Sequence, residues 1–283
     1  MESKIIGKCV KGLSPSKLNL PNQDYLDWRS DKTMILSVSD GHGSAMYFRS
    51  DNGSKLAVEV SIEILTDFLV KTLSEEEPPS LSAIKRFAEE SLPTQLIKEW
   101  RNRVKNHWGT HPFEQEILVQ LVEKKGESVL KKLQERPEIA YGATLLSVAI
   151  TETFALFIQL GDGDILVVSK ENEICQPIPA DEEIMGSETH SLCELEASKY
   201  IHVVFQSLSD NKPELIFVST DGLSNSFTTA EGFQQMAKDI ASLIRQEGLG
   251  WVEEQLESWL TEYTHKGSGD DVTLGIIELD VPP

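Results

Sequence analysis

Aspartate followed by glycine occurs at three places where the alternation of apolar residues predicts the end of a β-strand. These steps are Asp40-Gly41, Asp162-Gly163 and Asp221-Gly222, and a fourth acidic pair, Asp270-Asp271, stands where another strand begins. The start of one strand in an antiparallel sheet lies beside the end of its neighbour, so all four positions can meet at one edge. Glycine after each aspartate permits a tight turn and lets backbone carbonyls approach a ligand.

Carboxylates that converge and stay ionised near neutral pH need a cation between them, because like charges at contact distance otherwise force protonation. Ligands made of oxygen alone suit a hard divalent ion, Mg²⁺ or Mn²⁺, better than zinc or copper. Any single Asp-Gly step is also ordinary turn chemistry. The four together favour a metal centre.

The run Asp40-Gly41-His42-Gly43 is the most specific of these signals. It places an imidazole two residues beyond an expected metal ligand, with glycine on both sides. A histidine in that place can donate a proton at neutral pH. The alternative is that His42 is a surface turn residue.

The elements that must position these residues are short strands and amphipathic helices. We predict strands at about 5–10, 34–39, 144–150, 154–160, 165–169, 200–206, 215–220 and 272–279, and helices at about 51–71, 81–106, 112–134, 229–247 and 250–263. The helix at about 51–71 is expected to take its N-cap from Asp51 or Asn52, and the strands between 144 and 169 are expected to form an antiparallel meander. Together they predict an α+β fold with a mainly antiparallel sheet, in one domain over 1–283 with a helical region at about 81–134.

Composition excludes several classes of protein. The chain has 283 residues, with 26 Lys and Arg against 46 Asp and Glu, for a net charge of −20. Such a surface repels phosphate backbones and anionic lipid, so neither nucleic-acid nor membrane binding is expected. The start of the chain lacks a signal-peptide core, and no apolar run is long enough to span a bilayer. Three scattered cysteines fit a reduced setting, and we expect a cytoplasmic protein.

Six short motifs, in this order and spacing, resemble the metal-dependent protein phosphatases of the 2C type. They are Asn22-Gln23-Asp24, Asp40-Gly41-His42-Gly43, Tyr141-Gly142-Ala143-Thr144, Gly161-Asp162, Ser219-Thr220-Asp221-Gly222-Leu223 and Asp270-Asp271-Val272-Thr273. The resemblance covers nearly the whole chain. It implies two antiparallel sheets packed as a sandwich and flanked by paired helices, with a two-metal site at one end.

The resemblance also implies roles for single residues. Asp40 would bridge two Mg²⁺ or Mn²⁺ ions, with the carbonyl of Gly41 on one of them. Asp221 and Asp270 would complete the protein ligands of the other ion. Asp24 would serve the ion that Gly41 contacts, directly or through water.

Two further roles follow from the same resemblance. Asp162 matches a position that, with Asp221, holds a third and weaker ion in some members of the family, and His42 matches the proposed general acid for the departing alcohol. A water that bridges two such ions is acidified toward hydroxide at neutral pH, while the ions neutralise the phosphoryl oxygens during in-line attack.

The sequence departs from the family pattern at three positions. Asn19 stands where many members have an arginine that grips the substrate phosphate, and Lys17 is the nearest cation that could replace it. Lys17 could equally be a solvated surface lysine. Gln23 occupies a place that is often glutamate. Asn225 lies four residues after Asp221, where many members have a second aspartate that supports the ligands.

The leading hypothesis is therefore a metal-dependent phosphatase acting on phosphoserine or phosphothreonine in proteins, with phosphoproteins and a cognate kinase system as its partners. The alternatives are a pseudophosphatase that binds a phosphoprotein without turnover, and a phosphatase of small phosphorylated molecules. The oligomeric state is not determined by the sequence, and a monomer is the working expectation.

Overall fold

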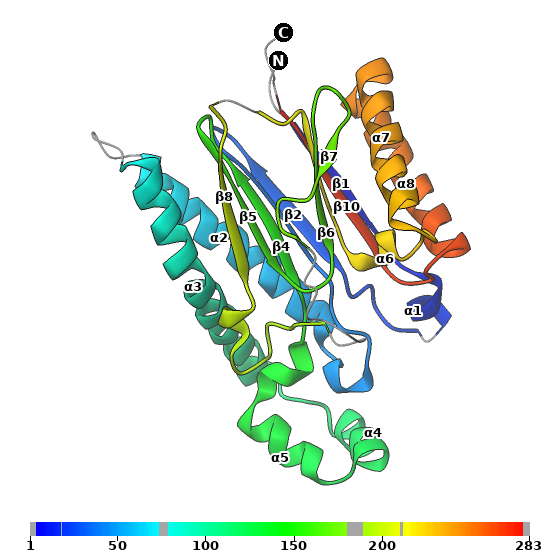
Figure 1. Ribbon diagram of the computed structural model, residues 1–283. Helices are drawn as coiled ribbons and strands as arrows, with labels where there is room; N and C mark the ends of the chain where they lie inside the picture. Colours follow the sequence, from blue (N-terminus) through cyan, green and yellow to red (C-terminus); the bar gives the residue numbers. More distant parts are fainter. Residues whose placement is uncertain (1–3, 18, 74–78, 180–188, 210–211, 280–283) are drawn as a thin grey trace.

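The strands of the protein form a sandwich of two antiparallel sheets (Figure 1). The computed structural model describes residues 4–17, 19–73, 79–179, 189–209 and 212–279. Within them, one five-stranded sheet has the order β1-β10-β9-β6-β7 and the other has the order β2-β3-β4-β5-β8. The strands are β1 (Lys4–Val10), β2 (Tyr25–Ser30), β3 (Met34–Ser39), β4 (Leu145–Ile150), β5 (Phe154–Leu160), β6 (Asp164–Val168), β7 (Ile174–Cys175), β8 (His202–Ser207), β9 (Leu215–Ser219) and β10 (Val272–Glu278).

Paired helices cover the outer face of each sheet (Figure 1). Helices α2 (Ser50–Leu73) and α3 (Leu81–Thr110) pack on the sheet that contains β3, and α7 (Ala230–Glu247) and α8 (Leu249–Lys266) pack on the sheet that contains β10. The remaining helices are α1 (Leu13–Lys17), α4 (Gln115–Lys125), α5 (Ser128–Glu135) and α6 (Asp221–Ser224), with single 3₁₀ turns η1 (Ala45–Tyr47), η2 (Pro137–Tyr141) and η3 (Ala197–Lys199). The layers are therefore helix, sheet, sheet and helix, as expected.

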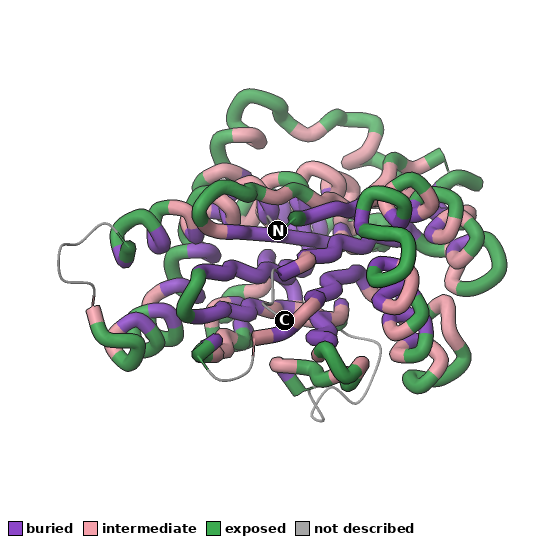
Figure 2. The backbone as a smooth tube through the Cα atoms, turned by 90° about the horizontal axis from the view of Figure 1, so that it is seen from above, coloured by how far each residue is buried: buried purple, intermediate pink, exposed green. Residues whose placement is uncertain are grey.

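The central strands are apolar on both faces because each sheet is covered on both sides, by the other sheet and by helices. In β3, Ile35 packs under the helices while Leu36 packs between the sheets, and both side chains are completely buried. Seen from above, the strands form a buried centre and exposed residues follow the outer helices and loops (Figure 2). None of the described helices is both long and apolar enough to cross a membrane.

Three expectations about the elements were wrong. The strand β6 leaves the expected meander, since it pairs with β7 and β9 in the opposite sheet, whereas β4 and β5 do pair with each other. The expected helix at 112–134 is two helices, because Gly126 adopts φ 85° between α4 and α5. Helix α2 begins at Ser50, so Asp51 and Asn52 lie in its first turn and not at its cap.

Candidate active site

Strand ends from both sheets meet at one end of the sandwich. The pairing of Tyr25 with Ser39 places Asp24 beside Asp40, the residue that follows β3. In the other sheet, Ser219 pairs with both Leu274 and Asp164. This register brings Asp221, at the start of α6, close to Asp270 before β10 and to Asp162 before β6. The strand register thus brings the acidic positions together, as expected. We call this group the acidic edge; it consists of Asp24, Asp40, Asp162, Asp221, Asp270 and Asp271.

Asp24 is a deeply buried carboxylate of this edge, with 5% of its surface exposed. Its Oδ2 atom accepts hydrogen bonds of 2.8 Å from the hydroxyls of Thr220 and Thr273. Its Oδ1 atom is buried and has no hydrogen-bond partner. Burial, followed by the charge of the neighbouring Asp271, raises the pKa of Asp24 to about 8. A buried oxygen with no donor needs compensation, and a cation would supply it.

The carboxyl groups of Asp40 and Asp221 lie close enough for each to change the pKa of the other. Burial and the charges of Asp24 and Asp221 raise the pKa of Asp40 well above its usual range. Burial, followed by the charge of Asp162, raises the pKa of Asp221 to about 6. Carboxyl groups this close cannot all ionise without a counter-charge, so the edge strongly favours a bound cation or protons.

Backbone hydrogen bonds fix the turn that carries Gly41 and His42. The amide of Gly41 donates to the carbonyl of Gln23 at 3.0 Å, and the amide of His42 donates to the carbonyl of Gly142 at 3.1 Å. The amide of Thr144 donates to the carbonyl of Asp40 at 2.8 Å. A Cβ atom on Gly41 would lie only 2.7 Å from the carbonyl oxygen of Gln23, so the chain requires glycine here.

Gln23 holds this turn with its side chain as well. Its Nε2 atom donates to the carbonyl of His42 at 3.1 Å and to the hydroxyl of Ser50. Its own amide donates to Oδ2 of Asp271 at 2.7 Å, while the other oxygen of Asp271 accepts the amide of Gly12 at 2.7 Å. The sequence alone marks Gln23 only as the loss of a possible carboxylate ligand and predicts no role for Asp271. Both residues position the turns around the acidic edge.

His42 lies beside the carboxylates with its ring against Tyr47, the two ring centroids being 4.8 Å apart. Burial lowers the pKa of His42, although the charges of Asp162 and Glu194 oppose that effect. A lowered pKa makes the protonated imidazole a stronger acid but a less abundant one near neutral pH.

The other expected site residues occupy different surroundings. Asp162 is exposed and accepts a hydrogen bond from the hydroxyl of Thr189. Asp270 is also exposed, and its Oδ1 atom accepts the amide of Asp271 at 2.9 Å. Asn225 donates from Nδ2 to Oδ2 of Asp221 at 2.9 Å. Lys17 is the exposed last residue of the short helix α1, which lies before the turn to Asn22.

The donor set fits hard divalent cations. Negative charges lie close together here, on the carboxylates of Asp24, Asp40, Asp221 and Asp270, and they contribute to the raised pKa values of the first three. The unpartnered Oδ1 of Asp24 belongs to the same group. In the described ranges, no three acidic, histidine or cysteine side chains are arranged closely enough to hold a metal ion by themselves. The carboxylates are therefore gathered and short of positive charge.

Comparison with known proteins identifies the family. A family model for protein phosphatase 2C matches residues 11–261. This chain therefore belongs to the protein phosphatase 2C family. A search of curated proteins found no match.

Solved structures share the fold. The serine/threonine phosphatase Stp1 from Staphylococcus aureus is 15% identical with a TM-score of 0.59, over 99% of this chain and 96% of that one. A serine/threonine phosphatase of S. agalactiae is 17% identical with a TM-score of 0.55, over 98% and 100% of the two chains. The catalytic domain of the serine threonine protein phosphatase PstP, in complex with two manganese ions, is 13% identical with a TM-score of 0.53, over 98% of each chain.

Proposed function

We propose that this protein is a Mg²⁺- or Mn²⁺-dependent phosphatase that hydrolyses phosphoserine and phosphothreonine in proteins. The observation that carries the proposal is the buried, unpartnered Oδ1 of Asp24 beside carboxyl groups whose pKa values are raised by one another. Such a group lacks positive charge, and divalent ions would supply it. Membership of the protein phosphatase 2C family and the two manganese ions named for PstP support the same function.

Asp40 would hold both ions, with Asp24 and the carbonyl of Gly41 serving one of them and Asp221 and Asp270 the other. Asp162 would assist a third, weaker ion. Two bound divalent ions supply an activated water at neutral pH and neutralise a phosphoryl group. The chain's own contribution is to keep these oxygens in place through the backbone hydrogen bonds of the Gly41 turn.

His42 would donate a proton to the departing serine or threonine oxygen. Its ring lies beside the acidic edge and is held against Tyr47. Because burial lowers its pKa, His42 loses its proton at a lower pH than a solvent-exposed histidine does. We place the enzyme in the cytoplasm, acting against a serine/threonine kinase system.

One observation favours a second candidate, a phosphoprotein-binding module without turnover. Asn19, where many family members have a phosphate-gripping arginine, adopts a left-handed conformation with φ 55°, and Lys17 lies on the exposed end of α1. A point charge on a flexible stem does not reproduce a bidentate guanidinium. Weak phosphate binding without hydrolysis would follow if the two ions alone were insufficient.

The test is phosphate release from a phosphothreonine peptide by purified protein with Mn²⁺, with Mg²⁺ and with EDTA. The proposal expects release that needs the metal and that is lost in Asp221→Asn. Release that survives both EDTA and the substitution contradicts the metal mechanism. Binding of Mn²⁺ and peptide without any release would favour the second candidate, and faster hydrolysis of phosphorylated metabolites would identify a small-molecule phosphatase.

A further inference from the structure

A cavity of about 210 Å³ opens next to the acidic edge. Its walls come from three segments: the turn between β5 and β6, the strand β7 with the residues after it, and the residues that lead into β8. Asp162 lines this cavity, and its negative charge also favours the protonated forms of Asp221 and His42. A cavity of this size is too small for a nucleotide or a drug-sized ligand and suits one side chain.

Acidic and aromatic groups line this cavity. Asp164 lines it from the start of β6, where its carboxylate accepts from Nε2 of Gln176 at 3.2 Å. The rings of His190 and Tyr200 stack at 3.8 Å between centroids with 12° between their planes, and Tyr200 is 38% exposed. Among the described residues that line the cavity there is no lysine or arginine.

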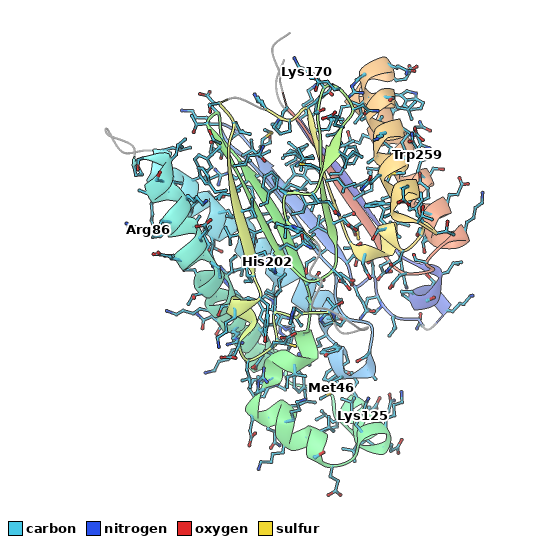
Figure 3. All side chains as sticks on the ribbon, in the orientation of Figure 1. Met46, Arg86, Lys125, Lys170, His202 and Trp259 are labelled. Carbon is cyan, nitrogen blue, oxygen red and sulfur yellow. The ribbon has the colours of Figure 1, made fainter. Side chains whose placement is uncertain are left out.

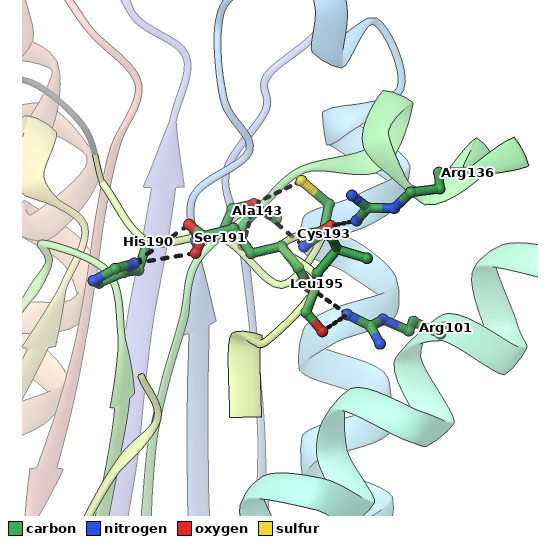
Figure 4. A network of polar contacts seen from close by, with 8 residues as sticks. Arg101, Arg136, Ala143, His190, Ser191, Cys193 and Leu195 are labelled. Carbon is green, nitrogen blue, oxygen red and sulfur yellow. Dashed lines mark hydrogen bonds and ion pairs between the residues drawn. The ribbon is translucent and has the colours of Figure 1, made fainter. Parts of the chain in front are cut away.

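The aromatic wall is held in place from several sides (Figure 4). Nδ1 of His190 lies 3.2 Å from the carboxylate of Glu194. The amide of Leu192 donates to the carbonyl of Ala143 at 2.9 Å, which attaches the wall to the strand beside the Gly41 turn. Arg101 from α3 donates to the carbonyl of Glu194. The wall is thus fixed relative to the acidic edge before any substrate arrives.

Further lining residues come from the edge strand β8 and from the segment after β7. His202, at the start of β8 (Figure 3), lines the cavity, and Ile178 contributes an apolar part. The carboxylate of Asp164, a stacked aromatic pair and an apolar part match a guanidinium on an aliphatic stem. Guanidinium groups pair with carboxylates through two hydrogen bonds and stack on aromatic rings, which an ammonium group does less well.

We propose that this cavity binds an arginine side chain of the substrate protein, close in sequence to the phosphorylated serine or threonine. The inference rests on the proposed phosphatase function and specifies its substrates as phosphorylation sites with a nearby arginine. The net charge of −20 adds to the attraction, because a cationic flank compensates for the repulsion between an acidic protein and a phosphopeptide.

The experiment compares phosphothreonine peptides that carry arginine at one flanking position at a time with peptides that carry citrulline, its neutral isostere, at the same position. We expect arginine at one position to raise kcat/KM about tenfold, mainly through KM, which is the effect of one good charge-assisted pair. Asp164→Asn and, separately, Tyr200→Leu should each reduce this preference to less than about threefold. The matched control Glu171→Gln removes a charge from the adjacent β6–β7 turn, outside the cavity, and should keep the preference.

Hydrolysis of p-nitrophenyl phosphate, which has no flanking residue, should stay within about twofold in all three variants. The inference is overturned if wild-type protein shows no arginine preference, or if the preference survives both cavity substitutions. It is also overturned if Asp164→Asn instead changes the Mn²⁺ concentration for half-maximal rate, since the cavity would then be a metal site.

Binding separates failure of this inference from failure of the phosphatase function. If wild-type protein hydrolyses neither substrate, the proposed function fails, and the cavity is judged by fluorescence anisotropy of the labelled peptides. A dissociation constant about tenfold lower for arginine than for citrulline, lost in Asp164→Asn, supports the cavity. Equal constants overturn it.

Discussion

The buried carboxyl of Asp24 should make the protein less stable as the pH rises when no metal is present. Its pKa of about 8 lies far above the usual value of 3.8 because the side chain is buried beside other carboxylates. The folded state therefore holds this proton more tightly than the unfolded state does. Stability from this group is complete below about pH 4 and is lost as the pH rises from there toward 8.

The magnitude follows from the size of the shift. Each pH unit between the two pKa values costs about 1.4 kcal/mol, so this group should cost about 2 kcal/mol between pH 6 and 7.5 and about 4 kcal/mol in total by pH 7. Asp24→Asn removes the charge and keeps an oxygen that can accept from Thr220 and Thr273. In EDTA at pH 7 the variant should then unfold about 7 °C higher than wild type, given the unfolding entropy of a chain of this length.

Added Mn²⁺ should make wild type more stable than Asp24→Asn. The ion compensates the negative charges of the wild-type carboxylates, whereas the variant offers it one ligand fewer. The assay is thermal and urea unfolding at pH 6 and 7.5, with EDTA or with Mn²⁺. Asp27→Asn, an exposed position on the same strand, is the matched control and should change neither slope. A variant less stable than wild type in EDTA at pH 7, or one with an unchanged pH slope, would refute the reasoning.

Other substitutions test how the Gly41 turn and the helices are supported. Gln23→Met removes the donor to the carbonyl of His42. It should lower the free energy of unfolding, measured in urea, by about 1–2 kcal/mol and should reduce turnover. Unchanged turnover would show that this contact does not position His42. Gly53→Ala would place a Cβ atom 1.8 Å from the carbonyl oxygen of Tyr141 and should cost more than about 3 kcal/mol or prevent folding. In Gly109→Ala, on α3, the added Cβ atom would have no neighbouring atom within 4 Å, so the substitution should raise the free energy of unfolding by up to about 1 kcal/mol. Equal effects of the two glycine substitutions would contradict this description.

Most elements of the fold could be predicted from the sequence because apolar periodicity reports where strands and helices form, whereas the two-sheet sandwich was implied only by the resemblance to the protein phosphatase 2C family. Periodicity does not report which strand a strand pairs with, so the sequence did not show that β6 crosses to the other sheet after β5. The short strand β7, with two residues, is too brief to leave a pattern. The break at Gly126 could have been found, since glycine in a positive-φ turn commonly ends a helix.

The acidic edge could be predicted because its residues carry their chemistry in their types and in their places at strand ends. The supporting residues could not. The carboxylate of Asp271 accepts hydrogen bonds from the backbone amides of Gly12 and Gln23. Both residues are far from Asp271 in the sequence and become its neighbours only in the folded protein. Thr220 and Thr273 were read as parts of motifs, and only the structure shows both hydroxyls on one oxygen of Asp24.

The central claim is that this edge holds two divalent ions, and calorimetric titration of Mn²⁺ into EDTA-treated, dialysed protein tests it most directly. We expect two ions for each chain and a loss of both in Asp40→Asn, since Asp40 would contact each of them. Heats equal to those of buffer alone, or identical titrations for wild type and Asp40→Asn, would contradict the account.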